Sequence, residues 1–164
     1  MKRTGWINNN INNPESVADH SFRTAILANL FIKNVPTLNS EKVLKMVLMH
    51  DLGESIIGDI VTEDGNHTLL QQSVKDNQEI EAVKMLFNNL DEMTSSIIIE
   101  YIEQKTQESK FVKELDKLEM IIQALEYEME TGKNLNSFWE NVEKYFKTPE
   151  IIDTFKKLKT LRKN

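Results

Sequence analysis

The chain contains no cysteine, although it is 164 residues long. This absence excludes a disulfide framework, a thiolate metal site and a cysteine nucleophile, and it fits a reducing compartment. No apolar run approaches the roughly 20 residues that a membrane-spanning helix needs. The first residues, Met1 to Trp6, also lack the apolar segment of a secretory signal. We therefore expect an intracellular, cytoplasmic protein that has no membrane partner.

A surplus of positive charge is also missing, since 20 Lys and Arg residues stand against 26 Asp and Glu residues and the net charge is −6. This balance argues against a general nucleic-acid-binding protein. It does not exclude a small anionic substrate that is held by a few local cations or by a metal. The remaining composition, with 40% hydrophobic and 28% charged residues, is typical of a soluble globular protein, and the length favours one domain.

Strand signals are weak throughout the chain, whereas helical signals recur. Ser16 and Asp19 have the spacing of a capping box, and Phe22, Ile26 and Leu30 then repeat at the helical step of four. Residues 1–14 are rich in Asn and are expected to be irregular. Further helices are predicted over residues 41–49, 71–89, 91–103, 109–130, 136–146 and 149–161. The sequence thus predicts an all-α bundle of about six or seven helices.

The adjacent pair His50-Asp51 ends a strongly apolar run that begins at Val43. A helix that is apolar nearly all round is buried, so it delivers these two polar side chains to the interior. A buried charge is costly unless it is paired or bound to a metal. In a helix, Glu54 lies on the same face as His50 and Asp51, where it could handle a proton. The alternative interpretation is that His50-Asp51 merely closes a buried helix.

His20 and Asp116 come from two other predicted helices that face the same core. With His50-Asp51 they provide two imidazoles and two carboxylates, which suit a divalent transition metal better than an all-oxygen calcium site. Taken alone, His20 could be an ordinary core residue, and Asp116 could be a rim carboxylate paired with Lys113 or Lys117. His67, the third and last histidine, lies among turn residues and is expected to be exposed.

Several short blocks, in their order and spacing, carry a family resemblance. These blocks are Arg3-Thr4-Gly5-Trp6, Pro14-Glu15-Ser16-Val17-Ala18-Asp19-His20, His50-Asp51-Leu52-Gly53-Glu54, Gly58-Asp59 and Glu114-Leu115-Asp116-Lys117-Leu118-Glu119. Together they resemble the 5′-deoxynucleotidase branch of the HD-domain metal-dependent phosphohydrolases, over about residues 3–130. The resemblance implies a single HD domain over residues 1–164, with a core over about 16–130 and closing helices over about 136–161.

The resemblance also implies a set of metal ligands, which are His20, His50, Asp51 and Asp116. The divalent ion could be Mn, Co, Zn, Ni, Fe or Mg. The affinity order favours copper, nickel or zinc over manganese in almost any such site, so the bound ion depends on availability. Glu54 is implied to position or deprotonate the attacking water, or to bind a second ion. Asp59 is implied to contact the sugar 3′-hydroxyl or to share that second ion.

Two residues near the start of the chain are implied to bind the substrate. Arg3 would grip the phosphate, and Trp6 would crowd the sugar so that a 2′-hydroxyl fits poorly. In the bacterial enzyme of this branch the matching Arg and Trp are adjacent, whereas here two residues separate them. Relatives often carry a further Arg just after the Trp, and this chain has Asn8-Asn9-Asn10 there.

The implied activity is removal of the 5′-phosphate from deoxyribonucleoside 5′-monophosphates, by a protein that is expected to form a homodimer. One alternative is an HD phosphohydrolase that acts on another nucleotide or phosphoester. Another is a non-catalytic helical protein in which the metal is structural. Two-iron members of the superfamily use additional histidines between the His-Asp pair and the last Asp. Only His67 lies in that interval, which argues against them.

Overall fold

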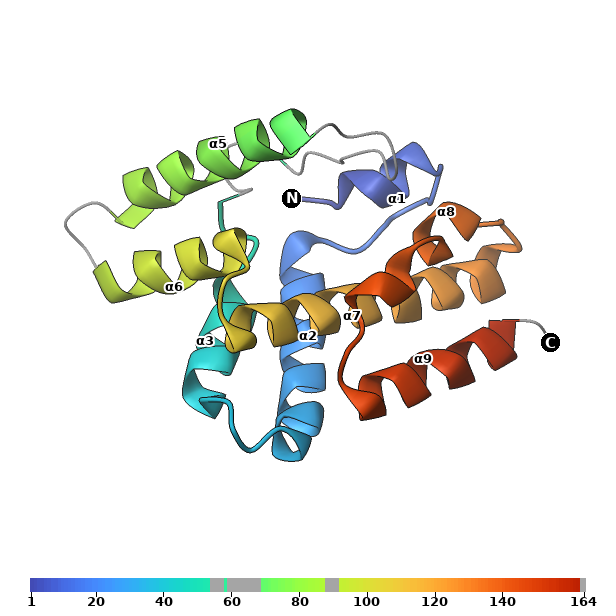
Figure 1. The fold of residues 1–164 in the computed structure, drawn as a ribbon. Coiled ribbons are helices and arrows are strands. Elements are labelled where there is room, and N and C mark those ends of the chain that lie inside the picture. Colours follow the sequence, from blue (N-terminus) through green and yellow to red (C-terminus); the bar gives the residue numbers. More distant parts are fainter. Residues whose placement is uncertain (54–57, 59–68, 88–91, 163–164) are drawn as a thin grey trace.

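The computed structural model describes residues 1–53, 58, 69–87 and 92–162, and the regular elements in these ranges are helices (Figure 1). The predicted all-α fold is confirmed. The helices are α1 (Thr4–Asn8), α2 (Val17–Phe31), α3 (Ser40–Met49), α5 (Leu69–Phe87), α6 (Glu92–Glu103), α7 (Gln107–Thr131), α8 (Asn136–Trp139) and α9 (Pro149–Arg162), with 3-10 turns η1 (Ile32–Asn34) and η2 (Val142–Tyr145). Among the described helices, none is both long and apolar enough to cross a bilayer.

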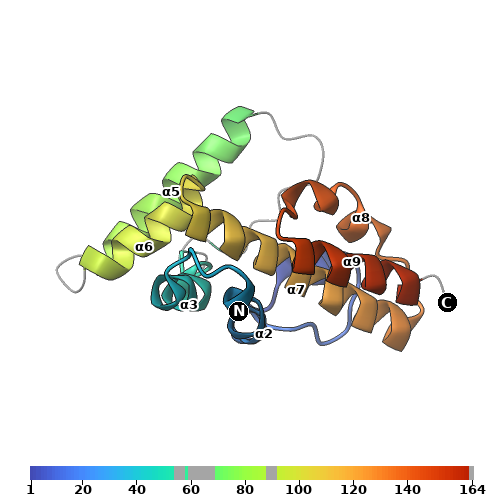
Figure 2. The ribbon, with the colours of Figure 1, turned by 60° about the horizontal axis from the view of Figure 1, so that its bottom comes forward.

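Helix α7 runs through the middle of the molecule and organises the other elements. It contacts α2, α3 and α6, and it also contacts α8, η2 and α9. Figures 1 and 2 show α5 and α6 paired at one end of the molecule and α9 lying alongside α7 at the other. The part of α7 that packs against α2 and α3 can therefore bring its side chains to theirs.

The sequence of α7 explains both its length and its limits. Thr106 and Ser109 form a reciprocal capping box at its start, and Gly132 ends it in the left-handed region at a φ of 68°. Between these ends, the apolar side chains repeat at steps of three and four and are buried; they include Leu115, Leu118, Ile121 and Leu125. The predicted helix over residues 109–130 is thus extended slightly at both ends.

Helix α2 presents a face to the core that differs from its apolar stripe. Its capping box of Ser16 and Asp19 is formed as predicted. However, Phe22, Ile26 and Leu30 are 65%, 49% and 52% exposed, whereas the buried residues are His20, Thr24 and Ala28. The small side chains at the two latter positions let α2 approach its neighbours closely, and the Thr24 hydroxyl is satisfied by donating to the His20 carbonyl at 2.8 Å. The packing therefore turns His20 inward.

Two predicted segments differ from the structure. Residues 1–14 are not wholly irregular, because α1 forms over Thr4–Asn8 and buries Trp6. The predicted continuous helix over residues 136–146 is instead divided into α8 and η2. Asn141 adopts a left-handed conformation between them, with a φ of 58°. Asn tolerates this conformation better than most residues, so the chain can turn there.

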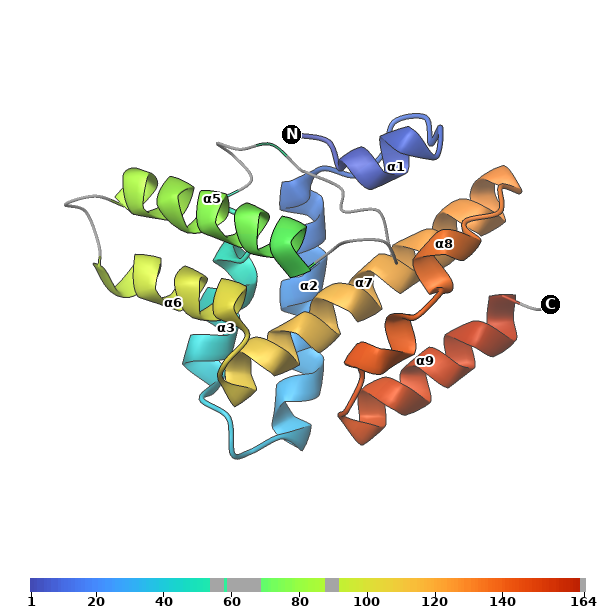
Figure 3. The same cartoon turned by 45° about the horizontal axis from the view of Figure 1, so that its top comes forward.

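The N-terminal arm lies against the start of α2. The Val17 amide donates to the Met1 carbonyl at 3.0 Å, and the Arg3 amide donates to the Glu15 carbonyl at 3.1 Å. In Figure 3 the arm and α1 cover the end of α2 at which His20 lies. These backbone contacts hold the Arg3 side chain next to the first turns of α2.

Candidate metal centre

His50 and Asp51 follow α3 directly, so the buried helix carries them into the interior. His50 is fully buried, and its Nδ1 lies 2.7 Å from the Val47 carbonyl oxygen. Because a carbonyl can only accept, Nδ1 carries the proton in this hydrogen bond and Nε2 keeps its lone pair. That Nε2 lies 3.3 Å from Asp51 Oδ1. The main chain of α3 therefore selects the tautomer that can bind a metal.

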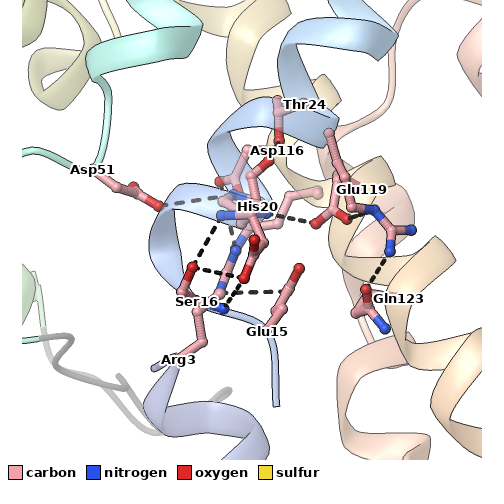
Figure 4. Close-up of polar contacts among 12 residues, drawn as sticks. Arg3, Glu15, Ser16, His20, Thr24, Asp51, Asp116, Glu119 and Gln123 are labelled. Atoms are coloured by element: carbon pink, nitrogen blue, oxygen red, sulfur yellow. Dashed lines mark hydrogen bonds and ion pairs between the residues drawn. The ribbon is translucent and has the colours of Figure 1, made fainter. Parts of the chain in front are cut away.

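His20 meets this pair from α2, and Asp116 meets it from α7. His20 Nε2 lies 3.3 Å from Asp116 Oδ1 and 3.8 Å from Asp51 Oδ2. The two imidazole centroids are 5.3 Å apart. Figure 4 shows Asp51 and Asp116 approaching His20 from different elements. The four residues that the sequence assigned to the metal are thus brought together in the fold.

The donor atoms fit a metal ion. Ligand atoms of His20, His50 and Asp116 all lie within 4.8 Å of one another. Within the described ranges, both Nε2 atoms are buried and have no hydrogen-bond partner. An unpaired polar atom in a protein interior is costly and calls for an explanation. Two such nitrogens beside two carboxylates are the donor set of a divalent transition metal.

Asp116 is held by groups on the side away from His20. Its Oδ2 accepts a hydrogen bond from the Tyr101 hydroxyl at 3.1 Å and lies 3.0 Å from the Lys113 ammonium. The Tyr101 ring also packs edge-on against His50, with centroids 5.1 Å apart. The pairing of Asp116 with Lys113, considered as an alternative to a metal role, is therefore present together with the cluster. It leaves Oδ1 facing His20.

The two histidines have opposite pKa shifts. Burial lowers the pKa of His50, because a charged ring would lose its hydration. Burial and the charge of Arg3 act in the same direction on His20, but its contacts with Asp116 and Glu119 outweigh them and raise its pKa to about 9. Without a metal, His20 is thus protonated at neutral pH. A divalent ion would replace that proton.

The two carboxylates are kept ionised by the charges around them. Burial alone would raise the pKa of Asp51, but His50 and His20 hold it below its usual value. Burial acts in the same way on Asp116, yet the charges of Lys113 and Lys117 and the contact with His20 hold the pKa of Asp116 well below the ordinary range. Both groups therefore remain anionic, as metal ligands must be.

Arg3 brings the one guanidinium that reaches this cluster from the N-terminal arm. Its side chain is 18% exposed, and its Nε lies 3.9 Å from Glu15 Oε1. Burial works against its charge, but Asp51, Asp116 and Glu15 raise the pKa of Arg3, so the cation is retained. Within the described residues, its buried Nη1 has no hydrogen-bond partner. This nitrogen is available to an anionic ligand.

Trp6 lies in the hydrophobic core rather than at an open surface. It is 1% exposed, its ring stacks on Phe138 with centroids 4.2 Å apart, and Tyr127 meets its edge at 5.2 Å. Its Nε1 donates to Glu15 Oε1 at 2.9 Å. This geometry fits the alternative of a hydrophobic anchor that docks the arm. A contact between Trp6 and the sugar stays a prediction.

Three residues singled out in the sequence lie outside the described residues, namely Glu54, Asp59 and His67. The last described residue before them is Gly53, and it shows why this position lacks a side chain. A Cβ atom on Gly53 would lie 2.6 Å from Glu79 Cγ and 3.4 Å from Val83 Cγ2. Helix α5 therefore packs directly against the end of the His-Asp segment, and it brings Glu79 close to the cluster.

Glu79 is a buried carboxyl group whose pKa is raised to about 7, first by burial and also by the charge of Asp51. Lys75 and Lys113 act against this rise, and Asp76 adds to it. The folded state keeps this proton up to a higher pH than the unfolded state does. Glu79 therefore leaves the free energy of unfolding undiminished below about pH 4.5 and lowers it progressively as the pH rises towards 7. We expect Glu79→Gln to stabilise the metal-free protein at pH 8 by on the order of 2–3 kcal/mol, with little effect at pH 4.5.

Urea denaturation of the two proteins at both pH values measures this difference. Glu81→Gln is the matched control, because Glu81 lies on the same helix, is 67% exposed and pairs only with Lys84 within the described residues. Equal free energies of unfolding for Glu79→Gln and the parent protein at pH 8 would contradict the prediction.

The comparisons with known proteins agree with this geometry. The fold and the cluster define a helical protein with a His/Asp centre that could hold a metal ion. The chain belongs to the HD-domain family, whose model matches residues 1–159. It is 40% identical to the 5′-deoxynucleotidase HDDC2 of Danio rerio and 37% identical to that of Homo sapiens, covering 96% and 99% of this chain and 79% of each relative. A conserved hypothetical protein from Pyrococcus furiosus has a similar structure, with a TM-score of 0.76, 34% identity, and 98% and 92% of the two chains covered.

Among the residues that surround the ligands, sequence reasoning assigned a contact only to Lys113, as a possible partner of Asp116. Glu119, Tyr101 and Lys113 each contact a ligand of the predicted set, and Arg23 contacts Glu119. Two of these positions carried a usable signal. Glu119 lies three residues after Asp116 and Arg23 lies three residues after His20, so each shares a helix face with a predicted ligand.

Proposed function

We propose that this protein is a metal-dependent 5′-deoxynucleotidase, which hydrolyses deoxyribonucleoside 5′-monophosphates to deoxyribonucleosides and phosphate. The observation that carries the proposal is the pair of buried, unpartnered Nε2 atoms of His20 and His50, which face the carboxylates of Asp51 and Asp116 beside Arg3. Relatives that match most of this chain and carry the name 5′-deoxynucleotidase support the substrate class.

The proposed role of each residue follows from the chemistry of its side chain. His20, His50, Asp51 and Asp116 would hold the divalent ion, and availability would decide among Mn, Co, Zn, Ni, Fe and Mg. When bound, the ion supplies a polarised phosphoryl oxygen and a water of lowered pKa. Arg3 would bind the phosphate through the planar fork of its guanidinium, which matches two phosphate oxygens. The net charge of −6 makes such a local cation necessary.

Other roles in the proposal rest on the family resemblance. Glu54 would position the attacking water or bind a second ion, and Asp59 would contact the sugar 3′-hydroxyl or share that ion. Trp6 would limit the space for a 2′-hydroxyl. We further propose that residues 1–164 form one HD domain in a cytoplasmic homodimer. The exposed stripe of Phe22, Ile26 and Leu30 supports self-association, because a second copy could remove it from water.

Phosphate release from a panel of nucleotides tests the activity. The protein is stripped with a chelator and then receives Mn²⁺, Co²⁺, Mg²⁺ or Zn²⁺ before incubation with deoxyribo- and ribonucleoside 5′-monophosphates. We expect release that depends on the metal and favours the deoxy forms. Deoxyribonucleoside 3′-monophosphates are the matched control, because they carry the same groups with the phosphate at the other end of the sugar. Metal binding without release from any 5′-monophosphate would contradict the proposed function.

A further inference from the structure

Glu119 is the carboxylate in closest contact with His20, and it lies on the side of the ring away from the proposed metal. Its Oε2 is 2.5 Å from His20 Nδ1, while His20 Nε2 faces Asp116. Glu119 is only 1% exposed, and its other oxygen, Oε1, lies 2.8 Å from Arg23 Nε. Glu119 thus lies between the His20 imidazole and the Arg23 guanidinium, and Figure 4 shows its contact with His20.

A carboxylate in this position is not explained by stability. Removing a carboxylate from water is expensive, and replacing a buried ion pair by apolar side chains is often neutral or stabilising. The side chains that contact Glu119 are polar, since His20 lies at one of its oxygens and Arg23 at the other. We therefore look for the contribution of this carboxylate in its contact with His20 and not in the stability of the core.

We propose that Glu119 is a positioning residue for the metal, and that Arg23 holds Glu119 in place. By accepting the Nδ1 proton of His20, Glu119 leaves the Nε2 lone pair directed at Asp51 and Asp116. Carboxylates behind ligating histidines commonly fix the ring and raise its basicity. This inference rests on the metal centre of the proposed function, although it does not depend on which phosphoester is the substrate.

The two contacts of Glu119 make the effect of Glu119→Gln specific. Both neighbours of the carboxylate favour an oxygen: His20 Nδ1 is hydrogen-bonded to Oε2, and the Arg23 guanidinium forms an ion pair with Oε1. A glutamine has one acceptor oxygen and one NH₂ group. Because arginine cannot give up its proton, we expect the amide oxygen to turn to Arg23 and the NH₂ group to turn to His20. Nδ1 must then accept, the proton moves to Nε2, and His20 loses the lone pair that binds the metal.

The same reasoning predicts that a second substitution, at Arg23, restores metal binding to Glu119→Gln. In a double variant, Arg23→Met with Glu119→Gln, the guanidinium no longer competes for the amide oxygen. The glutamine can then accept the Nδ1 proton of His20, as Glu119 does. Loss of Arg23 also releases Glu126, but that carboxylate is 52% exposed and can be solvated. A residue that only supports the fold would not be rescued by a second substitution.

Titration of the stripped protein with Co²⁺, followed by its visible absorption, measures the binding directly. We expect Glu119→Gln to weaken Co²⁺ binding by about 10–100-fold. In the Arg23→Met background the same substitution should change the affinity by less than about fivefold, since the coupling has been removed. Glu126→Gln is the matched control, because Glu126 contacts Arg23 without reaching His20, and it should bind Co²⁺ as the parent does.

A second readout reports the tautomer. In the zinc-loaded protein, nitrogen NMR with ¹⁵N-labelled histidine should show a proton on Nδ1 of His20, and Glu119→Gln should remove this signal while circular dichroism stays unchanged. Co²⁺ binding that is equal in Glu119→Gln and the parent, or equally weak in the single and double variants, would overturn the inference. Failure of the parent to bind Co²⁺ would overturn it as well. Tight Co²⁺ binding without nucleotide hydrolysis would contradict the proposed function alone.

Discussion

Asp51→Ala is expected to abolish metal binding and to lower kcat by about three orders of magnitude or more, since metal activation of water and phosphate contributes several kcal/mol to the barrier. The carboxylate lies 3.3 Å from His50 Nε2 and 3.8 Å from His20 Nε2, so it faces both imidazoles of the cluster. Without it, the cluster formed by the described residues keeps two imidazoles and the Asp116 carboxylate. Its side chain is 17% exposed, and we therefore expect the variant to fold.

Metal content after dialysis and phosphate release from deoxyribonucleoside 5′-monophosphates are the two measurements. The matched control is Asp153→Ala on α9, because Asp153 is 69% exposed and pairs only with Lys156 within the described residues. It removes the same charge at a site remote from the cluster. Parental metal content in Asp51→Ala would remove Asp51 from the ligand set, and parental activity would refute the proposed centre.

Arg3→Met is expected to lower kcat/KM by about 100-fold or more, because it removes a charge-assisted contact that strengthens as the phosphate approaches the transition state. Arg3 Nη1 is buried and, within the described residues, has no hydrogen-bond partner, so a ligand would supply its first one. Methionine keeps the apolar part of the side chain. Metal binding should persist, which separates this effect from that of Asp51→Ala.

Lys2→Met is the matched control for Arg3→Met, since it removes the same unit of charge one residue earlier in the arm. Long-range attraction of the nucleotide is then equally weakened in both variants, and only Arg3→Met loses the local contact. Steady-state kinetics with one deoxyribonucleoside 5′-monophosphate measures the difference. Equal values of kcat/KM for the two variants would exclude a direct contact between Arg3 and the phosphate.

Local sequence signals predicted the fold where helix ends and periodicity agreed. Helix α7 is the clearest case, because its apolar repeat and Gly132 both mark its extent. The burial of α2 was predicted less well. The stripe of Phe22, Ile26 and Leu30 is strongly apolar but exposed, because the side chains at His20 and Thr24 make the contacts that the interior requires. Tertiary packing, which a single helix does not encode, decided between the two faces.

The predicted metal ligands are adjacent in space because α2, α3 and α7 pack together. His20 and Asp116 lie on the inward faces of α2 and α7, and His50 and Asp51 directly follow α3. The residues behind them were harder to predict. Glu119 and Tyr101 contact ligands that are distant from them in the chain. In the sequence, a carboxylate that will be buried cannot be distinguished from an exposed charge on an amphipathic helix. Trp6 was difficult for a different reason. It belongs to a block that resembles the family and was predicted to contact the sugar, yet its side chain packs in the core.

The predicted ligands come from α2, from the two residues directly after α3 and from α7, and this separation has a consequence for folding. No single helix holds enough ligands to bind an ion tightly, so the unfolded chain should have little affinity for it. A bound ion then acts as a reversible cross-link between distant parts of the chain, and it adds about 2.7 kcal/mol to the free energy of unfolding at a free concentration 100 times Kd. The melting temperature should accordingly rise with the logarithm of the metal concentration. Thermal unfolding thus becomes a measure of the free metal available to the protein.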